Sequence, residues 1–533
     1  MSEAPFVLEY KRGYKHYKEN QHKDPSEWLD FCQNFSHGKQ GLVGLMSSKK
    51  DPDKKYVFKI SQYINYLIEH EYTVMKGLND LSSFCPHFCK VYGTVKAKVD
   101  PSKRKSGNPF KKVKNTITKE VMLMEHIDKA PKLCSYIKSS KIHEDVIYSC
   151  IKQVLMAVSM AQKKKNFSHY DLHSDNVLMK RCNKDLVFLY VIDEQNQFLV
   201  PTHGHYPVII DFGFSYINNM DDNYLWPSMG HTDVGFLSDR YDWVADPKLF
   251  LVSISSEIKE QRETKKAKKL RRIVKNMFQP LSIEWDCGWD NTDEYSTSDY
   301  LEEMLEDVSQ QSSLFSEFEH YCIDLIQSLV VLPLENRSYD NLHEAYKAFL
   351  DEFIKIEDQV TNNFYLLYIL QGIVNAARDE QSNYHHANRR KEAVSNFKRR
   401  VYKCIDEVAK FCQPKNIQFE KMLCSLLVLG KNIEGVYYSL MKKKMKQKKK
   451  EYSRLPIQST EQVYACMEIN ISDQYEYNDN TTIFMFDCIR EKCVPFELTK
   501  DEISELNSMH AISRGVFLHE SYKNRTRSRV IPE

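Results

Sequence analysis

Two polar segments constrain the fold of this chain more than any other feature. The first begins at Phe167 with the sequence F-S-H-Y-D-L-H-S-D-N-V-L, which places Asp171 and Asn176 five residues apart. The second, V-I-I-D-F-G, ends at Gly213 and places Asp211 directly after three apolar residues that are typical of a buried strand. A carboxylate beside a hydroxyl can accept its proton, and carboxylate and amide oxygens are ligands that Mg²⁺ prefers. The pattern therefore predicts a site built from a loop and a strand end.

The composition is that of a folded and nearly neutral protein. The chain has 533 residues, of which 42% are hydrophobic, and a formal net charge of +2. This excludes a disordered chain and gives no overall bias toward nucleic acid or a membrane. The 14 cysteines lack the spacing of a disulfide framework, which indicates reduced thiols. With neither a signal peptide nor an apolar run of ~18–20 residues, we expect an intracellular, cytoplasmic protein.

Strand-like segments come first in the sequence and helix-like segments later, which predicts an α+β fold built on an antiparallel sheet. Residues 144–165 carry apolar side chains at helical spacing and end in a run of lysines, so we expect a long helix there. We divide the chain into an N-terminal extension, one domain, and a mostly helical C-terminal region with a Lys-rich segment. These are residues 1–33, 34–350, 351–533 and 442–450, respectively.

The two polar segments together resemble the catalytic loop and the D-F-G motif of the protein-kinase superfamily. The resemblance implies a two-lobed protein-kinase-like fold, with an antiparallel β small lobe over residues 34–128 and a mainly helical large lobe over residues 129–350. It also implies ATP and Mg²⁺ as cofactors. By this resemblance, Asp171 would orient the substrate hydroxyl and accept its proton, while Asn176 and Asp211 would hold the magnesium ions.

The upstream half contains the other parts that the resemblance requires. Val57-Phe-Lys59 resembles the strand whose lysine contacts the α and β phosphates, and Glu71 matches the helix glutamate that pairs with this lysine. Glu69 is the alternative, but the apolar spacing that follows favours Glu71. The preceding segment matches the second half of a glycine-rich phosphate loop, with a lysine in place of its first glycine. The expected ATP-binding loop comprises Gly38, Lys39, Gln40, Gly41, Leu42, Val43, Gly44, Leu45 and Met46.

The segment from Val121 to Ile127 resembles the strand that enters the hinge between the two lobes. Met124 would be the gatekeeper, and backbone groups of Glu125 to Ile127 would contact adenine. Earlier in the chain, Cys85-Pro-His-Phe-Cys89 has the residue types of a metal site. Because no second pair of soft ligands is visible, we interpret it as the connector that follows the helix.

Within the kinase superfamily, the H-Y-D-L-H-x-D-N loop, Gly230-His-Thr-Asp233 and Asp246-Pro-Lys-Leu-Phe250 are similar to segments of serine/threonine-protein kinases of large DNA viruses such as iridoviruses. Four departures from the general pattern stand out. Tyr170 replaces the usual arginine, His173 stands where a lysine is usual, and no A-P-E motif follows. The long separation of Asn176 from the D-F-G motif predicts an inserted β-hairpin around residues 182–205.

We therefore predict an ATP-dependent serine/threonine protein kinase whose substrates are proteins. His173 also occurs in the pattern of aminoglycoside and choline kinases, so a small-molecule phosphotransferase stays open as an alternative. A kinase-like binding scaffold is a third reading, because a fold can persist without activity. Asp246 could brace the catalytic loop through its backbone, or it could be an ordinary helix cap.

Three basic clusters, at residues 103–114, 265–275 and 442–450, raise the question of nucleic-acid binding. We interpret them as solvated faces, because the chain is nearly neutral overall, and we expect neither nucleic acid nor a membrane as a partner. The C-terminal region could instead dock a protein partner. If the protein is viral, a location in the virion is a further expectation.

Overall fold

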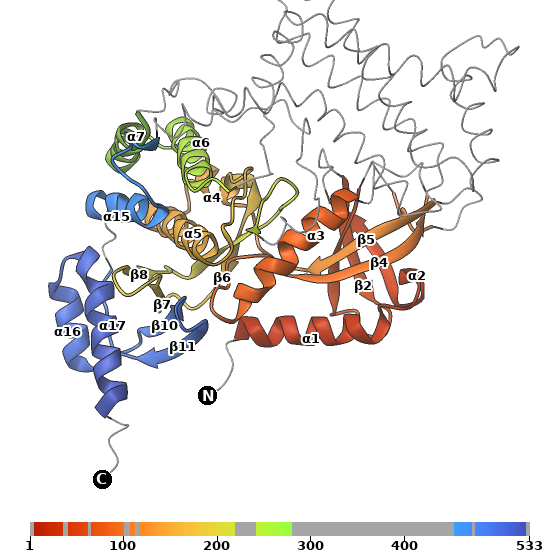
Figure 1. Cartoon of the computed structure of the whole chain (residues 1–533), viewed down its shortest axis with the longest axis horizontal. Helices are drawn as coiled ribbons and strands as arrows, with labels where there is room; N and C mark the ends of the chain where they lie inside the picture. Colours follow the sequence, from red (N-terminus) through yellow and green to blue (C-terminus); the bar gives the residue numbers. More distant parts are fainter. Residues whose placement is uncertain are drawn as a thin grey trace, which may run out of the picture.

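The structure is a computed structural model, and it describes residues 5–35, 41–61, 66–100, 107–111, 117–218, 241–279, 452–471 and 475–528. The fold is mixed α+β with antiparallel pairing throughout the N-terminal sheet, as the sequence predicts (Figure 1). The Lys-rich segment and residues 280–451 of the two regions expected to be mainly helical lie outside the described residues. None of the described helices is long and apolar enough to cross a bilayer.

A five-stranded sheet forms the N-terminal part of the molecule. Its strands, in spatial order, are β1 (Leu29–Asn34), β2 (Gly41–Ser48), β3 (Lys55–Ser61), β5 (Ile117–Glu125) and β4 (Val91–Val99). Successive side chains of a strand point to opposite faces. Phe58 and Ile60 of β3 therefore join an apolar cluster on the outer face, whereas Lys59 points to the other face. Helix α3 (Tyr66–Asn79) packs on that second face, against β3, β4 and β5.

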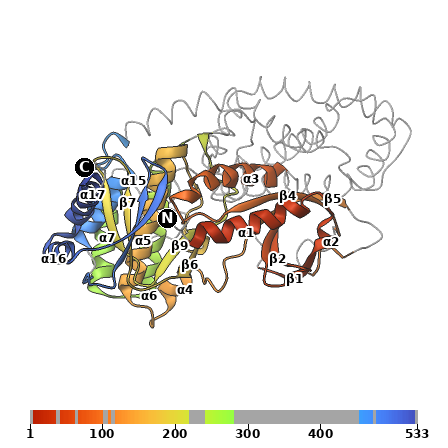
Figure 2. The same cartoon turned by 90° about the horizontal axis from the view of Figure 1, so that it is seen from below.

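Residues 5–33, the described part of the expected extension over residues 1–33, contribute to this sheet and its packing (Figures 1 and 2). The expected boundary falls inside β1, and helices α1 (Pro5–Asn20) and α2 (Pro25–Trp28) precede that strand. Tyr17 of α1 donates a hydrogen bond to the carbonyl of Thr94 at 3.0 Å. A Cβ at Gly93 would lie 2.0 Å from the Tyr17 hydroxyl oxygen, so the glycine makes room for this ring. The polar composition of α1 concealed this role, because tyrosine buries its ring while its hydroxyl stays hydrogen-bonded.

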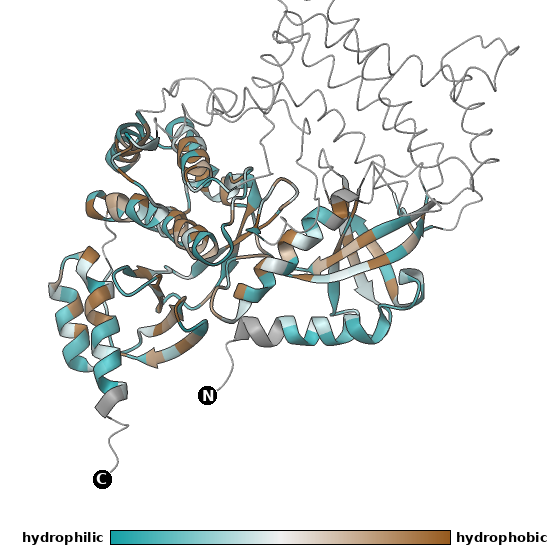
Figure 3. Cartoon of the chain, in the orientation of Figure 1, coloured by the Kyte–Doolittle hydropathy of each residue, from teal (hydrophilic) through white to brown (hydrophobic). Residues whose placement is uncertain are grey.

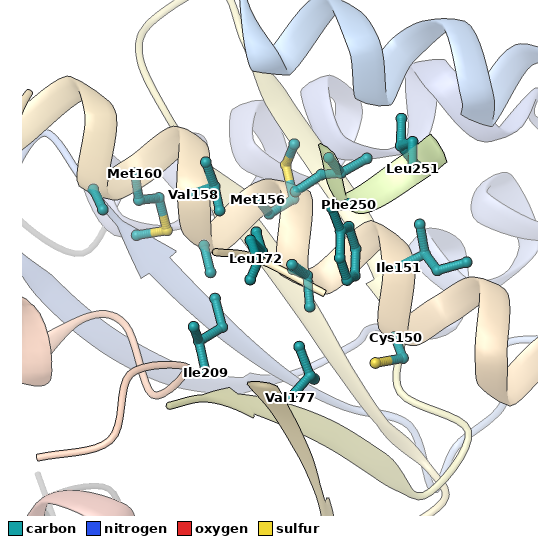
Figure 4. Close-up of a cluster of buried hydrophobic side chains, with 14 of the residues drawn as sticks. Cys150, Ile151, Met156, Val158, Met160, Leu172, Val177, Ile209, Phe250 and Leu251 are labelled. Carbon is teal, nitrogen blue, oxygen red and sulfur yellow. The ribbon is translucent and has the colours of Figure 1, made fainter. Parts of the chain in front are cut away.

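Helix α5 (Glu144–Lys165) is the central helix of the second part of the molecule and has the predicted bounds. It is buried along most of its length, and Ile151 and Val158 lie in one apolar cluster with Phe250 and Leu251 (Figure 4). A helix that is buried on nearly all sides belongs to the core of a large domain. The other helices of this core are α4 (Leu133–Lys138), α6 (Ala245–Gln261), α7 (Lys265–Phe278) and α15 (Thr460–Asn470).

Helix α7 contains the second of the three basic clusters, and it is amphipathic (Figure 3). Leu270 and Val274 are buried on its inner side, while Lys268 and Lys269 are exposed. The apolar residues account for the position of the helix against α6 and α15.

Two short strands, β6 (Val177–Arg181) and β9 (His205–Ile209), form an antiparallel pair around the expected insertion. The insertion is the predicted hairpin, made of β7 (Leu186–Val191) and β8 (Gln197–Pro201). The hairpin leaves β6 and β9 adjacent in space, although the whole insertion separates them in sequence.

The C-terminal region completes the sheet that this hairpin begins. Strand β10 (Thr482–Asp487) pairs in parallel with β7, and β11 (Lys492–Glu497) follows, giving the order β11-β10-β7-β8. Helices α16 (Lys500–Ser508) and α17 (Ala511–Ser528) come next, and α17 packs on β7 and β8. The described part of the region that we expected to be mostly helical thus adds two strands, as well as the three helices α15, α16 and α17, to the body of the protein. Sequence periodicity missed this because β10 is short and its partner strand lies far earlier in the chain.

Candidate functional site

Three segments that are far apart in the sequence meet at Lys59. Its Nζ lies 2.6 Å from Oε2 of Glu71 on α3 and 2.8 Å from Oδ1 of Asp211, which follows β9. The carboxylate of Glu71 also accepts a hydrogen bond from the backbone N–H of Phe212 at 3.2 Å. The predicted pair between Lys59 and Glu71 is therefore present, and Lys59 also contacts Asp211.

The local structure explains why these side chains meet. Strand alternation directs Lys59 toward α3, where Glu71 is buried on the side of the helix that faces the sheet. Asp211 has φ +65°, a conformation that is uncommon outside glycine, and it follows the strand pair β6–β9 directly. Phe212 beside it is fully buried, which anchors the turn.

Neighbouring opposite charges determine the protonation states of Lys59 and Asp211. Burial by itself would lower the pKa of Lys59, but Asp211 and Glu71 outweigh it and raise that pKa well above its usual range. Burial likewise opposes ionisation of Asp211, but the lysine beside it holds the pKa of this carboxyl below its usual range. At Glu71, burial outweighs the contact with Lys59 and raises the pKa of that carboxyl above its usual range. A charged lysine beside an ionised Asp211 is therefore the stable state at neutral pH.

Helix α6 holds the loop that contains Asp171 in place. Asp246, in the first turn of that helix, is fully buried and accepts hydrogen bonds from the backbone N–H groups of His169 at 2.7 Å and Tyr170 at 2.9 Å. Of the two roles considered for Asp246, the structure therefore shows the brace. Tyr170 has φ +61° and is buried, so the loop conformation depends on such contacts. The buried His169 bonds the carbonyl of Ile210 at 3.1 Å, which ties the loop to the Asp211 turn.

Asp171, His173 and Asn176 form a hydrogen-bonded group at the end of this loop. The amide nitrogen of Asn176 donates to the backbone carbonyl of Asp171 at 2.8 Å and to its Oδ2 at 3.1 Å. His173 Nε2 lies 3.6 Å from Asp171 Oδ1 and 3.1 Å from the Asn176 amide nitrogen. Burial opposes the charged form of His173, but its contact with Asp171 raises its pKa. The loop thus presents a partly exposed carboxylate with a basic imidazole beside it.

The residues of the expected phosphate loop fall into two groups. Gly38, Lys39 and Gln40 lie outside the described residues, and the six residues from Gly41 to Met46 lie on β2. Gly44 is in the middle of that strand, where a Cβ would lie 2.5 Å from the carbonyl oxygen of Gln33. Close packing between β1 and β2 is thus sufficient to require this glycine.

The expected hinge residues lie at and beyond the end of β5. Met124 is buried, and Glu125 ends the strand, with its side chain accepting a hydrogen bond from the backbone N–H of Lys90 at 2.8 Å. Ile127 lies in the following loop and packs against the large apolar cluster. The segment from Cys85 to Cys89 lies between α3 and β4, as expected of a connector, and both cysteines are buried among apolar side chains.

Hard oxygen ligands are available at Asp211 and Asn176. The Asp211 side chain is 40% exposed, although one of its oxygens contacts Lys59. Asn176 uses its amide nitrogen toward Asp171, which leaves its carbonyl oxygen for another ligand. Carboxylate and amide oxygens suit Mg²⁺, which commonly takes only one or two protein ligands and completes its shell with phosphates and water. Within the described residues, no group of three or more His, Cys, Asp or Glu has the arrangement of an all-protein metal site.

Some residues around the site make contacts that the sequence did not lead us to expect. Glu257 of α6 accepts a hydrogen bond from Ser174 Oγ at 2.6 Å, inside the loop that contains Asp171. His87 is fully buried, and its ring bonds the carbonyl of Pro207 at 2.9 Å and the hydroxyl of Tyr190 at 2.7 Å. Each contact joins segments that are distant in the sequence, and local spacing does not report such contacts.

Comparison with known proteins yields relatives from iridoviruses. The chain is 27% identical over 513 residues to uncharacterized protein 098R of Invertebrate iridescent virus 6, with 85% of each chain covered. It is 28% identical over 494 residues to uncharacterized protein 038R of Invertebrate iridescent virus 3, with 87% of this chain and 88% of the relative covered. A third relative, named probable kinase 098L, of Invertebrate iridescent virus 3, is 25% identical over 224 residues, which cover 40% of this chain and 37% of the relative. No protein-family model matches the chain.

Proposed function

We propose that this protein is an ATP- and Mg²⁺-dependent phosphotransferase of protein-kinase-like, two-lobed fold, acting on serine or threonine hydroxyls of proteins. The observation that carries the proposal is the contact of Lys59 with both Glu71 and Asp211. Phosphoryl transfer depends on positioning and on positive charge near the phosphates, and this arrangement fixes a lysine beside a metal-ligand candidate. The relative named probable kinase supports the same class of activity.

Each residue of the site has a chemical role in this proposal. Lys59 binds the α and β phosphates, and Glu71 holds the lysine in place. Asp211 and Asn176 hold Mg²⁺, which neutralises phosphate charge when bound. Asp171 orients the acceptor hydroxyl and takes its proton, and its position is set by the loop that Asp246 braces.

A small-molecule acceptor is the second candidate, and one observation favours it. His173 contacts both Asp171 and Asn176, so an imidazole occupies the space next to the candidate base. This is the side chain that the sequence shares with aminoglycoside and choline kinases. The two candidates use the same nucleotide site and differ only in the molecule that accepts the phosphate.

The test compares Asp171→Asn with the full-length wild type in an assay with radiolabelled ATP and a cell lysate. We expect the variant to lose about a hundred-fold or more in transfer rate, because the hydroxyl loses its proton acceptor, and to keep its affinity for ATP. Asp185→Asn is the matched control, because this carboxylate lies at the start of the β7–β8 hairpin and should leave the rate unchanged. Equal rates for wild type and Asp171→Asn would contradict the proposal.

The labelled product then separates the two acceptors. A protein kinase places the label in the fraction that a size filter retains, and acid hydrolysis of that fraction releases phosphoserine or phosphothreonine. A small-molecule kinase places it in the filtrate. Label confined to the filtrate would overturn the protein substrate while leaving phosphotransfer intact.

A further inference from the structure

The turn between β10 and β11 contacts both parts of the molecule. The Glu491 carboxylate lies 2.7 Å from Nζ of Lys164, near the end of α5, and the Glu491 carbonyl accepts a hydrogen bond from Ser83 Oγ at 3.3 Å. Ser83 ends the short helix η1 (Asp80–Ser83), which continues directly from α3. Next to it, Lys165 pairs with Asp80 at 2.6 Å. The end of α3 is thus attached to the end of α5, and the C-terminal turn spans this junction (Figure 1).

A buried contact supports the same junction from inside. Phe486 of β10 packs edge-on against His87, with 6.1 Å between ring centroids, and against Phe188 of β7 at 4.8 Å. His87 lies in the connector that follows η1, and its two ring nitrogens bond β9 and β7, at Pro207 and Tyr190. Strand β10 therefore packs against the connector that follows α3 and η1.

This connector also touches the strand that presents Asp211. The Ile209 backbone N–H donates to the His87 carbonyl at 2.7 Å, and its carbonyl accepts from the Cys89 N–H at 2.9 Å. Ile209 is the last residue of β9, and Asp211 follows two residues later. A series of contacts thus links the C-terminal hairpin to both carboxylates of the site. One series runs through α3 to Glu71, and the other runs through the connector and β9 to Asp211.

We propose that the β10–β11 hairpin is a positioning element of the phosphotransfer site, and that Glu491 is a positioning residue which keeps α3, and with it Glu71, aligned with Asp211. The inference rests on the proposed function for its effect on nucleotide affinity. Its structural part, the control of α3 by a hairpin from the far end of the sequence, does not depend on that function.

Two features separate this role from ordinary support of the core. The Glu491 side chain is 58% exposed and makes its ion pair at the surface, so its substitution leaves the apolar core intact. Glu491 also has φ +53°, which indicates that the turn is held in an uncommon conformation. A surface pair adds little to global stability, but it can bias the position of the helix to which it is connected.

The experiment uses the full chain with Glu491→Lys, which repels Lys164, and a matched control, Glu194→Lys. Glu194 is 62% exposed and pairs with Lys523 at 2.7 Å, but that pair joins the β7–β8 turn to α17 and does not reach α3. The first readout is hydrogen exchange of the amides in residues 66–79. The second is the Michaelis constant for ATP compared with that for the phosphate acceptor.

For Glu491→Lys we expect faster exchange in α3 and a Michaelis constant for ATP that rises by about two- to five-fold, the range of a surface ion pair. The constant for the acceptor and the melting temperature should stay unchanged, and Glu194→Lys should match the wild type in every readout. The double variant Glu491→Lys/Lys164→Glu should restore both properties, because it re-forms the pair with reversed charges.

Unchanged exchange in α3 for Glu491→Lys would overturn the proposal, as would an equal effect of Glu194→Lys. If the wild type shows no phosphotransfer, the exchange measurement still decides whether the hairpin controls α3. Failure of the positioning role is therefore distinguishable from failure of the proposed function.

Discussion

Two buried lysine–glutamate pairs lie in different regions of this protein, and their surroundings differ. Lys59 pairs with Glu71 between the N-terminal sheet and α3, and Lys152 of α5 pairs with Glu468 of α15. All four side chains are less than a tenth exposed. The lysine of the first pair also contacts a second carboxylate, Asp211, whose side chain is 40% exposed.

The two pairs differ in whether a further carboxylate and solvent lie beside them. The Lys152–Glu468 pair is closed inside the helical core, so its charges offset each other and fix the position of α15 on α5. Lys59 contacts two carboxyl groups, one more than is required to balance its single charge. The second of them, Asp211, is partly exposed to solvent. An excess oxygen ligand at an open edge is available to a ligand, whereas a closed pair is not.

The largest effect is expected for Asp211→Asn. We expect phosphotransfer to fall by about a thousand-fold, because the site loses the carboxylate that holds the metal in the proposed function. The free energy of unfolding should change little, since Lys59 retains Glu71 as its counter-ion. Steady-state kinetics and urea unfolding of the same preparation measure both quantities. A large loss of stability with normal activity in the remaining folded protein would show that this group, too, is structural.

The reverse outcome is expected at the closed pair. Lys152→Met should lower the free energy of unfolding by about 3 kcal/mol, because it leaves the Glu468 carboxylate buried without its counter-ion. The folded fraction should keep normal activity. The double variant Lys152→Met/Glu468→Leu should regain most of the stability, since apolar side chains of similar size can replace a buried ion pair. A double variant that stays as unstable as the single one would contradict this account.

A buried imidazole extends the comparison, because burial keeps it neutral whereas Lys59 stays charged. Burial lowers the pKa of His87 from 6.5 to about 4. Between these two values the unfolded chain binds a proton that the folded protein does not, so stability falls as the pH drops below 6.5. From pH 7 to pH 5 we expect this residue to reduce the free energy of unfolding by about 2 kcal/mol.

The measurement compares urea unfolding of wild type and His87→Gln at both pH values. The variant cannot acquire this proton, so its loss of stability should be smaller than that of the wild type by the stated amount. His70, whose pKa burial also lowers to about 4, is present in both proteins and cancels in the comparison. Equal pH dependence of the two proteins would show that His87 titrates normally in the folded state.

Much of the site could be predicted from local patterns. The helix over residues 144–165 follows from apolar periodicity, whereas the hairpin around 182–205 and the pairing of Lys59 with Glu71 follow from the resemblance to the kinase motifs, and the structure contains all three. Each depends on residues that lie near one another in sequence or on a strand whose alternation is regular. The roles of Asp171 and Asn176 in catalysis stay predictions, although the structure places them in one hydrogen-bonded group.

The sequence by itself determined which chemical groups are available, because a carboxylate, a lysine and an amide at fixed offsets from a strand or helix retain those offsets on folding. Only the tertiary structure decided what holds them. It placed α1 on the sheet through Tyr17 and Gly93, and it paired β10 with β7. These contacts join segments that are far apart in the chain, and their free energy comes from burial of complementary surfaces. Local sequence carries no record of such partners, since a short apolar strand is compatible with many neighbours until the chain has folded.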